Sequence, residues 1–208
     1  MTVETDPITS APLVVGIGGT TRPDSTSEHG LRAALDAAAR RGARTTCFDG
    51  RFLAELPPYA PERTHRTAGA VMLVDTVRVA DALIVATPAY HAGISGLVKN
   101  ALDYLEDLSR DERPYLDGRA VGCVVAALGG QALGSTLDSM RAVVQALRGW
   151  TTPVSVCLDS SSAPFDSTGA CRDTKAAQRL DLLGAQVVDF VTAQRAAAGA
   201  RWLTHQIR

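Results

Sequence analysis

Pro12-Leu-Val-Val-Gly-Ile-Gly18, followed directly by Gly19-Thr-Thr-Arg-Pro-Asp-Ser-Thr-Ser27, is the stretch of this sequence that decides the fold. The first seven residues are almost continuously apolar, which is typical of a strand buried on both faces of a parallel sheet. Within residues 25–41, apolar side chains recur at helical spacing, and Ser27 with Glu28 offers a candidate helix start. A strand, a glycine-containing loop and a helix in this order form the first unit of an α/β fold.

The same alternation continues along the chain. Further strands are expected at 43–49, 82–87, 120–128 and 154–158, and further helices at 67–80, 95–108, from the glycines after 128 to about 148, and at 174–195. Five strands alternating with five helices predict an α/β domain with a five-stranded parallel sheet and helices on both faces. The length fits a flavodoxin-like, doubly wound fold with strand order 2-1-3-4-5. We therefore expect one domain over 12–195, a flexible N-terminus at 1–11 and a C-terminal tail at 196–208.

Composition excludes several classes of protein. The chain has 208 residues, 46% hydrophobic and 21% charged, with a formal net charge of −1. That charge argues against nucleic acid as a partner and against an electron carrier with an acidic docking face. No basic and apolar leader opens the sequence, and no apolar run reaches membrane-spanning length. The four cysteines form no C-x-x-C pair, and no metal site is expected. We expect them to be reduced and structural, in a cytoplasmic protein.

The segment after the first strand is rich in donors for phosphate oxygens. Its hydroxyls and its guanidinium belong to Thr20, Thr21, Arg22, Ser25, Thr26 and Ser27. The free N–H groups and the dipole of the following helix also favour an anion. One arginine with several hydroxyls suits a single terminal phosphate, and this predicts a mononucleotide such as FMN.

Two other interpretations of this segment stay open. A dinucleotide fingerprint would place a third glycine where the chain has Thr21, although Asp49 after the second strand could still bind a ribose. A plain turn with Arg22 in solvent is the second interpretation.

A second unusual loop, Thr87 to Gly93, follows the third expected strand. In the order 2-1-3-4-5 the first and third strands are neighbours whose helices leave toward opposite faces, so a crevice opens beyond their ends. Proline, glycine and small residues can present backbone N–H groups to a flat ring such as isoalloxazine. Tyr90 and His91 could flank such a ring, and Pro88, Ala89, Ala92 and Gly93 complete the loop whose backbone would face it. A loop packed against a neighbouring subunit is the other interpretation.

Two later segments complete the predicted site. Gly129 and Gly130 follow the fourth strand, where glycines let the backbone approach a ligand closely or simply form a turn. The connection at 159–173 is rich in Ser and Thr, and its length suggests a lid, a partner contact or a disordered loop. No catalytic side chain is assigned, since hydride transfer to a flavin needs no protein base.

These loops resemble the motifs of the NADPH-dependent FMN reductase family of flavodoxin-like proteins. Gly19-Thr-Thr-Arg-Pro-Asp-Ser25 is similar to that family's Gly-Ser-x-Arg-x-x-Ser motif. Thr87-Pro-Ala-Tyr-His-Ala-Gly-Ile-Ser-Gly-Leu-Val-Lys-Asn100 resembles its Thr-Pro-x-Tyr-x-x-x-Ile-x-Gly-x-x-Lys-Asn segment. The resemblance implies that the first motif binds the FMN phosphate and that 88–93 lie against the flavin ring. Lys99 and Asn100 are expected to support loop or dimer geometry.

The resemblance also implies an activity. We expect an NAD(P)H-dependent FMN reductase that transfers a hydride from NADPH or NADH to FMN, and one outcome that the resemblance allows is that the reduced flavin leaves to supply a monooxygenase. The alternatives are an FMN-bound quinone, azo or metal-oxyanion reductase, and a non-enzymatic flavin electron carrier. The family implies a homodimer or homotetramer, formed through apolar faces on the helices expected at 95–108 and after 128. The sequence does not choose between NADPH and NADH.

Overall fold

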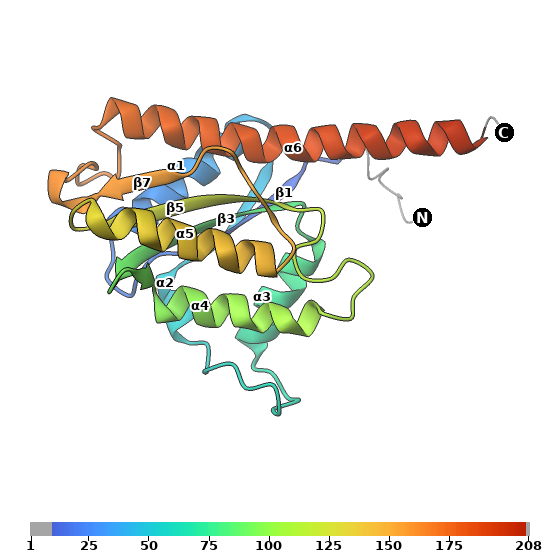
Figure 1. Cartoon of the computed structure of the whole chain (residues 1–208), viewed down its shortest axis with the longest axis horizontal. Coiled ribbons are helices and arrows are strands. Elements are labelled where there is room, and N and C mark those ends of the chain that lie inside the picture. The colour runs from blue at the N-terminus through green and yellow to red at the C-terminus, as the bar shows by residue number, and fades with distance from the viewer. Residues whose placement is uncertain (1–9, 207–208) are drawn as a thin grey trace.

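The computed structural model describes residues 10–206, of which 199–206 are described only as helical backbone. The strands are β1 (Leu13–Gly18), β2 (Arg44–Phe48), β3 (Ala82–Tyr90), β4 (Gly93–Ile94), β5 (Ala120–Ala127), β6 (Trp150–Thr151) and β7 (Val156–Asp159). The helices are α1 (Thr26–Arg40), α2 (Gly50–Ala54), α3 (Ala68–Val79), α4 (Gly96–Asp103), η1 (Tyr104–Leu108), α5 (Gln131–Ala146), η2 (Ser160–Ser162) and α6 (Thr174–Gln206). Figure 1 shows the sheet enclosed between these helices.

The sheet has the predicted strand order. Its path is β2-β1-β3-β5-β6, with β7 also parallel to β5 and with β4 antiparallel to β3. The five expected strands correspond to β1, β2, β3, β5 and β7, so the flavodoxin-like α/β fold is confirmed. The described residues form seven strands rather than the five expected. The two additional strands, β4 and β6, are only two residues long each. Strand β6 pairs with the start of β5 and β7 with its end, so two short strands share the last position.

The helices cover both faces of the sheet, as expected. One apolar core lies between the sheet and α3, α4 and α5, and it includes Leu73, Leu102 and Met140. The other lies beneath α1 and α6 and includes Leu31 and Leu183. Both faces of the central strands are buried, which explains why β1, β3 and β5 are apolar without alternation.

Helix starts are fixed by hydroxyl side chains. Ser25, and not Ser27, is the N-cap of α1, because its Oγ accepts a hydrogen bond from the N–H of Glu28 at 3.3 Å. Thr67 caps α3 and Ser95 caps α4 in the same way. At the other end of the chain, α6 continues to Gln206, beyond the expected end at 195. Residues 1–9 of the expected flexible N-terminus lie outside the described residues.

A buried arginine closes the end of the sheet where β3 and β5 begin. Arg119 is 1% exposed, and its guanidinium donates to the carbonyl oxygens of Ala80 at 3.0 Å, Tyr115 at 2.9 Å and Arg78 at 2.7 Å. Burial, with the nearby charge of Arg113, lowers the pKa of Arg119 to about 10. Its donors are directed at backbone carbonyls, so the side chain has a structural role.

The three cysteines that lie in strands differ in their exposure. Cys123 is buried in β5, where burial raises the pKa of its thiol to about 12. Cys47 and Cys157 are exposed because β2 and β7 are short strands with less cover, so they do not act as buried apolar residues. Among the described residues, no helix has the length and apolar character needed to cross a membrane.

Candidate functional site

The candidate site begins where β1 and β3 end side by side. Gly18 pairs with Ala86 and has a φ of +152°, and a Cβ added to Gly18 would lie 2.0 Å from the Ala86 oxygen. Any side chain here would therefore push the two strands apart. Beyond Gly18 the chain turns into the segment 19–25 and then enters α1.

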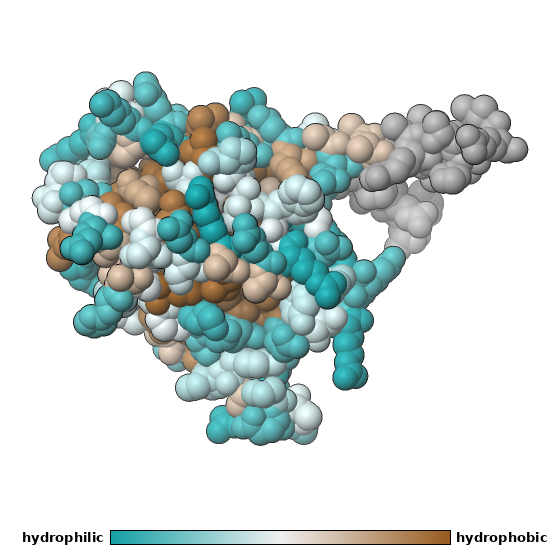
Figure 2. Space-filling view, in the orientation of Figure 1, coloured by the Kyte–Doolittle hydropathy of each residue, from teal (hydrophilic) through white to brown (hydrophobic). Residues whose placement is uncertain are grey.

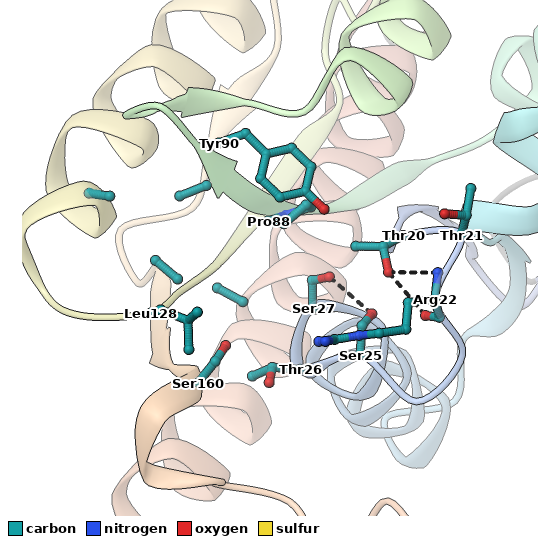
Figure 3. A pocket seen from close by; sticks show the side chains of 14 residues that line it. Thr20, Thr21, Arg22, Ser25, Thr26, Ser27, Pro88, Tyr90, Leu128 and Ser160 are labelled. Atoms are coloured by element: carbon teal, nitrogen blue, oxygen red, sulfur yellow. Dashed lines mark hydrogen bonds between the residues drawn. The ribbon is translucent and has the colours of Figure 1, made fainter.

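The donor-rich segment is held by its own hydroxyls. Thr20 Oγ1 accepts a hydrogen bond from the N–H of Arg22 at 3.2 Å and donates to the Arg22 oxygen at 3.0 Å. The hydroxyls of Ser25 and Ser27 lie 3.3 Å apart, and both side chains are buried (Figure 3). The N–H groups of Thr26 and Ser27 belong to the first turn of α1 and have no acceptor within the helix.

A short helix that the sequence analysis missed supports this segment from behind. Helix α2 starts at Gly50, and a Cβ on Gly50 would lie 2.1 Å from the Thr20 oxygen. Asp49 caps α2, since its Oδ1 accepts from the N–H groups of Arg51 at 3.1 Å and Phe52 at 3.0 Å. Because Asp49 is used as a cap and lines none of the cleft described below, the geometry does not favour the dinucleotide interpretation.

The two predicted loops converge on one cleft of ≈ 570 Å³. Its lining consists of Thr20, Thr21, Arg22, Ser25, Thr26, Ser27, Pro88, Ala89, Tyr90, Ala126, Ala127, Leu128, Ala132 and Ser160. Nine of the predicted site residues are in this set, and they come from both loops. Figure 3 shows the Arg22 side chain on one side of the cleft, with the ring of Tyr90 and Leu128 on the other side. The cleft is therefore polar at the start of α1 and mostly apolar at the ends of β3 and β5.

The second predicted loop is a hairpin rather than an irregular loop. Strand β3 continues through Tyr90, which pairs with Gly93 of β4. His91 and Ala92 form the turn with φ of 51° and 62°, so they, and not Gly93, adopt the left-handed conformation. Thr87 holds the base of the hairpin, because its Oγ1 accepts from the N–H of Ser95 at 2.9 Å.

Four other predicted residues lie beside the cleft. A second hollow of ≈ 730 Å³ adjoins it and shares Leu128 and Ala132 with it. The lining of this hollow is His91, Ala92, Leu128, Gly129, Gly130, Gln131, Ala132 and Ser135. Gly93 lines neither space. The structure thus brings 13 of the 14 predicted residues to two adjoining hollows at one end of the sheet.

Five lining residues of the cleft were not predicted. Ala126, Ala127, Leu128 and Ala132 follow from the end of β5, which lies beside β3. The rule that ligands bind beyond the carboxyl ends of parallel strands could have found them. Ser160 comes from the connection at 159–173, whose length and composition suggest a lid but do not single out this residue.

The connection at 159–173 packs against α1. The ring of Phe165 lies 5.3 Å from that of His29, and Phe165 forms an isolated bridge with Cys171. Asp166 Oδ1 accepts from the N–H groups of Thr168 at 2.8 Å and Ala170 at 3.1 Å. These contacts fix the connection in place, and Ser160 is the part of it that reaches the cleft.

The two helix residues of the second motif have different partners. Asn100 accepts from the N–H of Tyr59 at 2.7 Å and donates to the Pro57 oxygen at 3.0 Å. Lys99 pairs with Asp103 on the exposed side of α4. Asn100 therefore supports the loop after α2, as the sequence analysis expected of it.

The residues of the cleft fit a phosphorylated flat ring. Five hydroxyls, the Arg22 guanidinium and the free amides of α1 gather at the polar end, and no carboxylate lines the cleft. The other end offers apolar side chains and backbone. The volume lies within the range of about 300 to 1,000 Å³ that small-molecule sites occupy. Among the described residues, no three His, Cys, Asp or Glu side chains gather as metal ligands would.

Comparison with known proteins identifies the family. The family model described as NADPH-dependent FMN reductase matches residues 12–163. The chain belongs to this family. Membership in the NADPH-dependent FMN reductase family implies FMN and NADPH as cofactors, and it confirms the resemblance predicted from the two motifs.

Curated relatives include azoreductases. Over 106 residues the chain is 35% identical to an NADPH azoreductase from Bacillus sp. strain OY1-2, covering 50% of this chain and 56% of that protein. Over 121 residues it is 31% identical to an FMN-dependent NADPH-azoreductase from Staphylococcus aureus strain USA300, covering 57% of this chain and 61% of that protein. The chain thus spans less than two thirds of the length of these relatives.

Solved structures show the same fold. A flavoenzyme NAD(P)H:(acceptor) oxidoreductase, FerB from Paracoccus denitrificans, matches with a TM-score of 0.71 at 18% identity, over 87% of this chain and 97% of that one. A flavodoxin from Streptococcus pneumoniae matches with a TM-score of 0.57 at 13% identity, over 85% of this chain and 98% of that one. At these identities the comparisons support the flavodoxin-like fold alone.

Proposed function

We propose that this chain is an NAD(P)H-dependent FMN reductase and that it holds FMN in the cleft between the end of β1 and the end of β3. The observation that carries the proposal is the convergence on one cleft of the 20–27 segment and the 88–90 strand end, which are far apart in sequence. Family membership supplies the chemical class.

The polar end of the cleft would hold the phosphate. Arg22 can form a charge-assisted hydrogen bond with a phosphate oxygen, and the hydroxyls and the α1 amides can donate several more. The helix dipole favours the same anion. Ser25 and Ser27 are nearly fully buried and already oriented, so little conformational entropy is lost there on binding.

The apolar end would hold the ring. Pro88 and Ala89 at the end of β3 and the small residues Ala126 and Ala127 at the end of the adjacent strand β5 leave room for a flat group beside these strand ends, and Tyr90 and Leu128 stand exposed at the rim. When bound, the flavin would accept a hydride and later pass on its electrons, while the protein binds and orients it. No Asp, Glu, Lys or His lines this cleft, which suits a reaction that needs no protein base there.

The test is a flavin titration followed by reduction. The purified protein should quench FMN fluorescence on binding, and the bound flavin should lose its visible absorbance under anaerobic NADPH or NADH. Separate titrations with the two nucleotides give the preference between them. Protein that binds no FMN, or bound FMN that keeps its absorbance with both nucleotides, would refute the proposal.

The second candidate is a non-enzymatic electron carrier. The flavodoxin-like fold is compatible with this role, whereas the net charge of −1 gives no sign of the acidic docking face that such a carrier would present. The same anaerobic experiment separates the two functions, because a carrier would bind FMN without accepting a hydride from NADPH.

We also propose a homodimer or homotetramer through the helices α4 and α5. Figure 2 shows apolar side chains gathered in a band between these helices, and Leu97, Leu137 and Val143 are only partly buried there. Light scattering on the purified protein tests this, and a monomer at micromolar concentration would contradict it.

Supply of reduced FMN to a monooxygenase and a cytoplasmic location stay predictions, as does reduction of quinone, azo or metal-oxyanion acceptors.

A further inference from the structure

A third hollow lies at the end of the sheet opposite the cleft, where β3 begins. It has a volume of ≈ 290 Å³, and its charged lining residues are Asp81, Arg113 and Arg195. Gly118 and Gln194 also line it. Helix α6, which carries Gln194 and Arg195, runs past this end of the sheet (Figure 1). We call this space the arginine hollow, because it brings two guanidinium groups together.

Arg113 is a partly buried cation whose hydrogen bonds all go to backbone oxygens. Its Nε donates to the oxygen of Asp117 at 2.8 Å, its Nη1 to that of Ala80 at 3.3 Å and its Nη2 to that of Gly118 at 3.1 Å. In the part of the chain that the structure describes, no carboxylate forms an ion pair with it. Burial outweighs the attraction of Asp81 and Asp117 and lowers the pKa of this guanidinium. Its positive charge is therefore incompletely balanced.

Asp81 is the only acid in the described lining of the arginine hollow, and both of its carboxylate oxygens are occupied. Its Oδ1 accepts from Nη2 of Arg195 at 3.0 Å, and its Oδ2 accepts from the N–H of Leu13 at 2.8 Å. One carboxylate thus stands against the two guanidinium groups of Arg113 and Arg195. The lining keeps one positive charge in excess.

A third guanidinium lies behind the arginine hollow. The Nε of the buried Arg119 donates at 3.0 Å to the oxygen of Ala80, the same oxygen that accepts from Arg113. Asp111, another acid near Arg119, is already paired with Arg78 at 2.8 Å. The groups behind the hollow therefore do not cancel the excess positive charge of its lining.

Several N–H groups of the two lining arginines are left without an acceptor. A guanidinium carries five N–H donors. Arg113 uses three of them, and Arg195 uses two, on Asp81 and on the oxygen of Ser10 at 2.5 Å. Within the described chain, two donors of Arg113 and three of Arg195 have no partner. An oxyanion in the hollow would accept hydrogen bonds from both side chains.

From the excess charge and the unused donors we propose that the arginine hollow binds a small phosphate-type oxyanion between Arg113 and Arg195. Charge-assisted hydrogen bonds of this kind are about twice as strong as those between neutral groups. The volume lies at the lower end of the range of about 300 to 1,000 Å³ for small-molecule sites, which suits such an ion better than a nucleotide. The hollow and the cleft lie at opposite ends of the sheet, so the inference does not rest on the proposed flavin chemistry.

The first test is a titration of the full chain with inorganic phosphate. The amide NMR signal of Gly118 is followed while sodium phosphate replaces sodium chloride at constant pH and ionic strength. The signal should shift saturably with a Kd of about 1 mM, the affinity that a few charge-assisted hydrogen bonds to a hydrated ion can give. The amide signal of Ser27 reports separately on phosphate that enters the cleft.

A pair of variants locates the ion. Gln194→Glu adds a carboxylate to the lining, and the structure shows no hydrogen bond of the exposed Gln194 side chain that the change would break. The Kd for phosphate should rise about 10-fold, because a like charge nearby repels the ion. Gln178→Glu is the matched control, since it makes the same change at an exposed position of α6 outside the hollow. It should leave the Kd unchanged, and both variants should unfold close to the temperature of the unaltered protein.

Two results would overturn the inference. One is a Gly118 signal with no saturable shift up to about 10 mM phosphate, ten times the expected Kd. The other is an equal Kd for phosphate in Gln194→Glu and Gln178→Glu. Protein that binds no FMN would still give this titration, so the inference and the proposed function fail independently.

Discussion

Asp159 accepts a hydrogen bond from the backbone N–H of Gly129 at 3.2 Å, and this contact joins the end of β7 to the loop between β5 and α5. The same oxygen, Oδ1, accepts from the hydroxyl of Ser161 at 2.6 Å and from its N–H at 2.9 Å. One carboxylate thus fixes both the glycine loop beside the second hollow and the start of the connection that brings Ser160 to the cleft.

These bonds predict a pH response in acid. The hydroxyl of Ser161, its N–H and the N–H of Gly129 lower the pKa of Asp159 below its ordinary value. A carboxyl whose pKa is lower in the folded than in the unfolded state stabilises the folded loop at pH values above about 3.9, the pKa of an unfolded Asp. This contribution is lost as the pH falls through the folded pKa. The amide NMR signal of Gly129 should therefore titrate with a midpoint below about 3.9.

Two variants check the origin of that response. Asp159→Asn should abolish the titration of the Gly129 signal. Asp166→Asn should leave it intact, because Asp166 accepts only from residues within the 159–173 connection. A Gly129 signal that titrates unchanged in Asp159→Asn would show that another group is responsible.

Removal of Arg22 should weaken the binding of FMN but not of riboflavin. Arg22→Ala deletes a charge-assisted contact with phosphate worth about 1.5 to 3 kcal/mol, which corresponds to a rise in Kd of about 10- to 150-fold. Fluorescence titrations with both flavins measure this. Arg63→Ala is the control, since Arg63 lies in the exposed loop before α3 and lines no part of the cleft. Equal losses for the two flavins would show that Arg22 does not contact the phosphate.

A methyl group at Gly50 should displace the donor-rich segment 20–27, because Gly50 packs against the backbone of Thr20. In Gly50→Ala the new Cβ would meet the Thr20 oxygen at 2.1 Å, and backbone must move to admit it. We expect a loss of about 1 to 3 kcal/mol in unfolding free energy, as for other overpacked sites, together with weaker FMN binding. Denaturant unfolding and flavin titration measure the two effects.

Gly134→Ala is the matched control for Gly50→Ala. Its Cβ would have no neighbour within 4 Å, and it lies inside α5. Alanine is the better helix former by about 1 kcal/mol, so this variant should be more stable than the unaltered protein. Similar stability losses in both glycine variants would contradict the structure.

Asn100 and Lys99 are neighbours in sequence that should differ sharply in importance. Asn100→Ala leaves the N–H of Tyr59 and the oxygen of Pro57 without the partner they have now, which costs about 1 to 3 kcal/mol when such groups are buried. Lys99→Ala removes only an exposed i,i+4 pair with Asp103, worth about 0.3 to 0.5 kcal/mol. Thermal unfolding of the two variants gives the comparison, and equal effects would refute the assigned role of Asn100.

The sequence predicted the sheet because β1, β5 and residues 82–86 of β3 are continuously apolar and are separated by helical patterns. It missed β4 and β6 because two-residue strands have no periodicity to detect. It missed α2 because five residues are too few for a helical pattern, although Asp49 before Gly50 is a usual cap.

The site could be predicted as far as it depends on where strands end. Arg22 and Tyr90 lie where the topology requires. The division of the predicted residues between two hollows could not be foreseen, because it depends on the hairpin turn at His91 and Ala92 and on the path of α5. Neither the positive φ of those two residues nor the direction of a helix axis can be read from residue types.

The buried guanidinium of Arg119 makes the two ends of the sheet unequal in how much sequence change they tolerate. Replacement of Arg119 would remove at once the donor of three backbone carbonyls, one in a buried and two in part-buried hydrogen bonds, so substitutions at that end are costly. At the opposite end Tyr90 and Leu128 are 56% and 83% exposed, and exchanging them costs the core little. The rim of the cleft can therefore change in sequence while the scaffold is left alone.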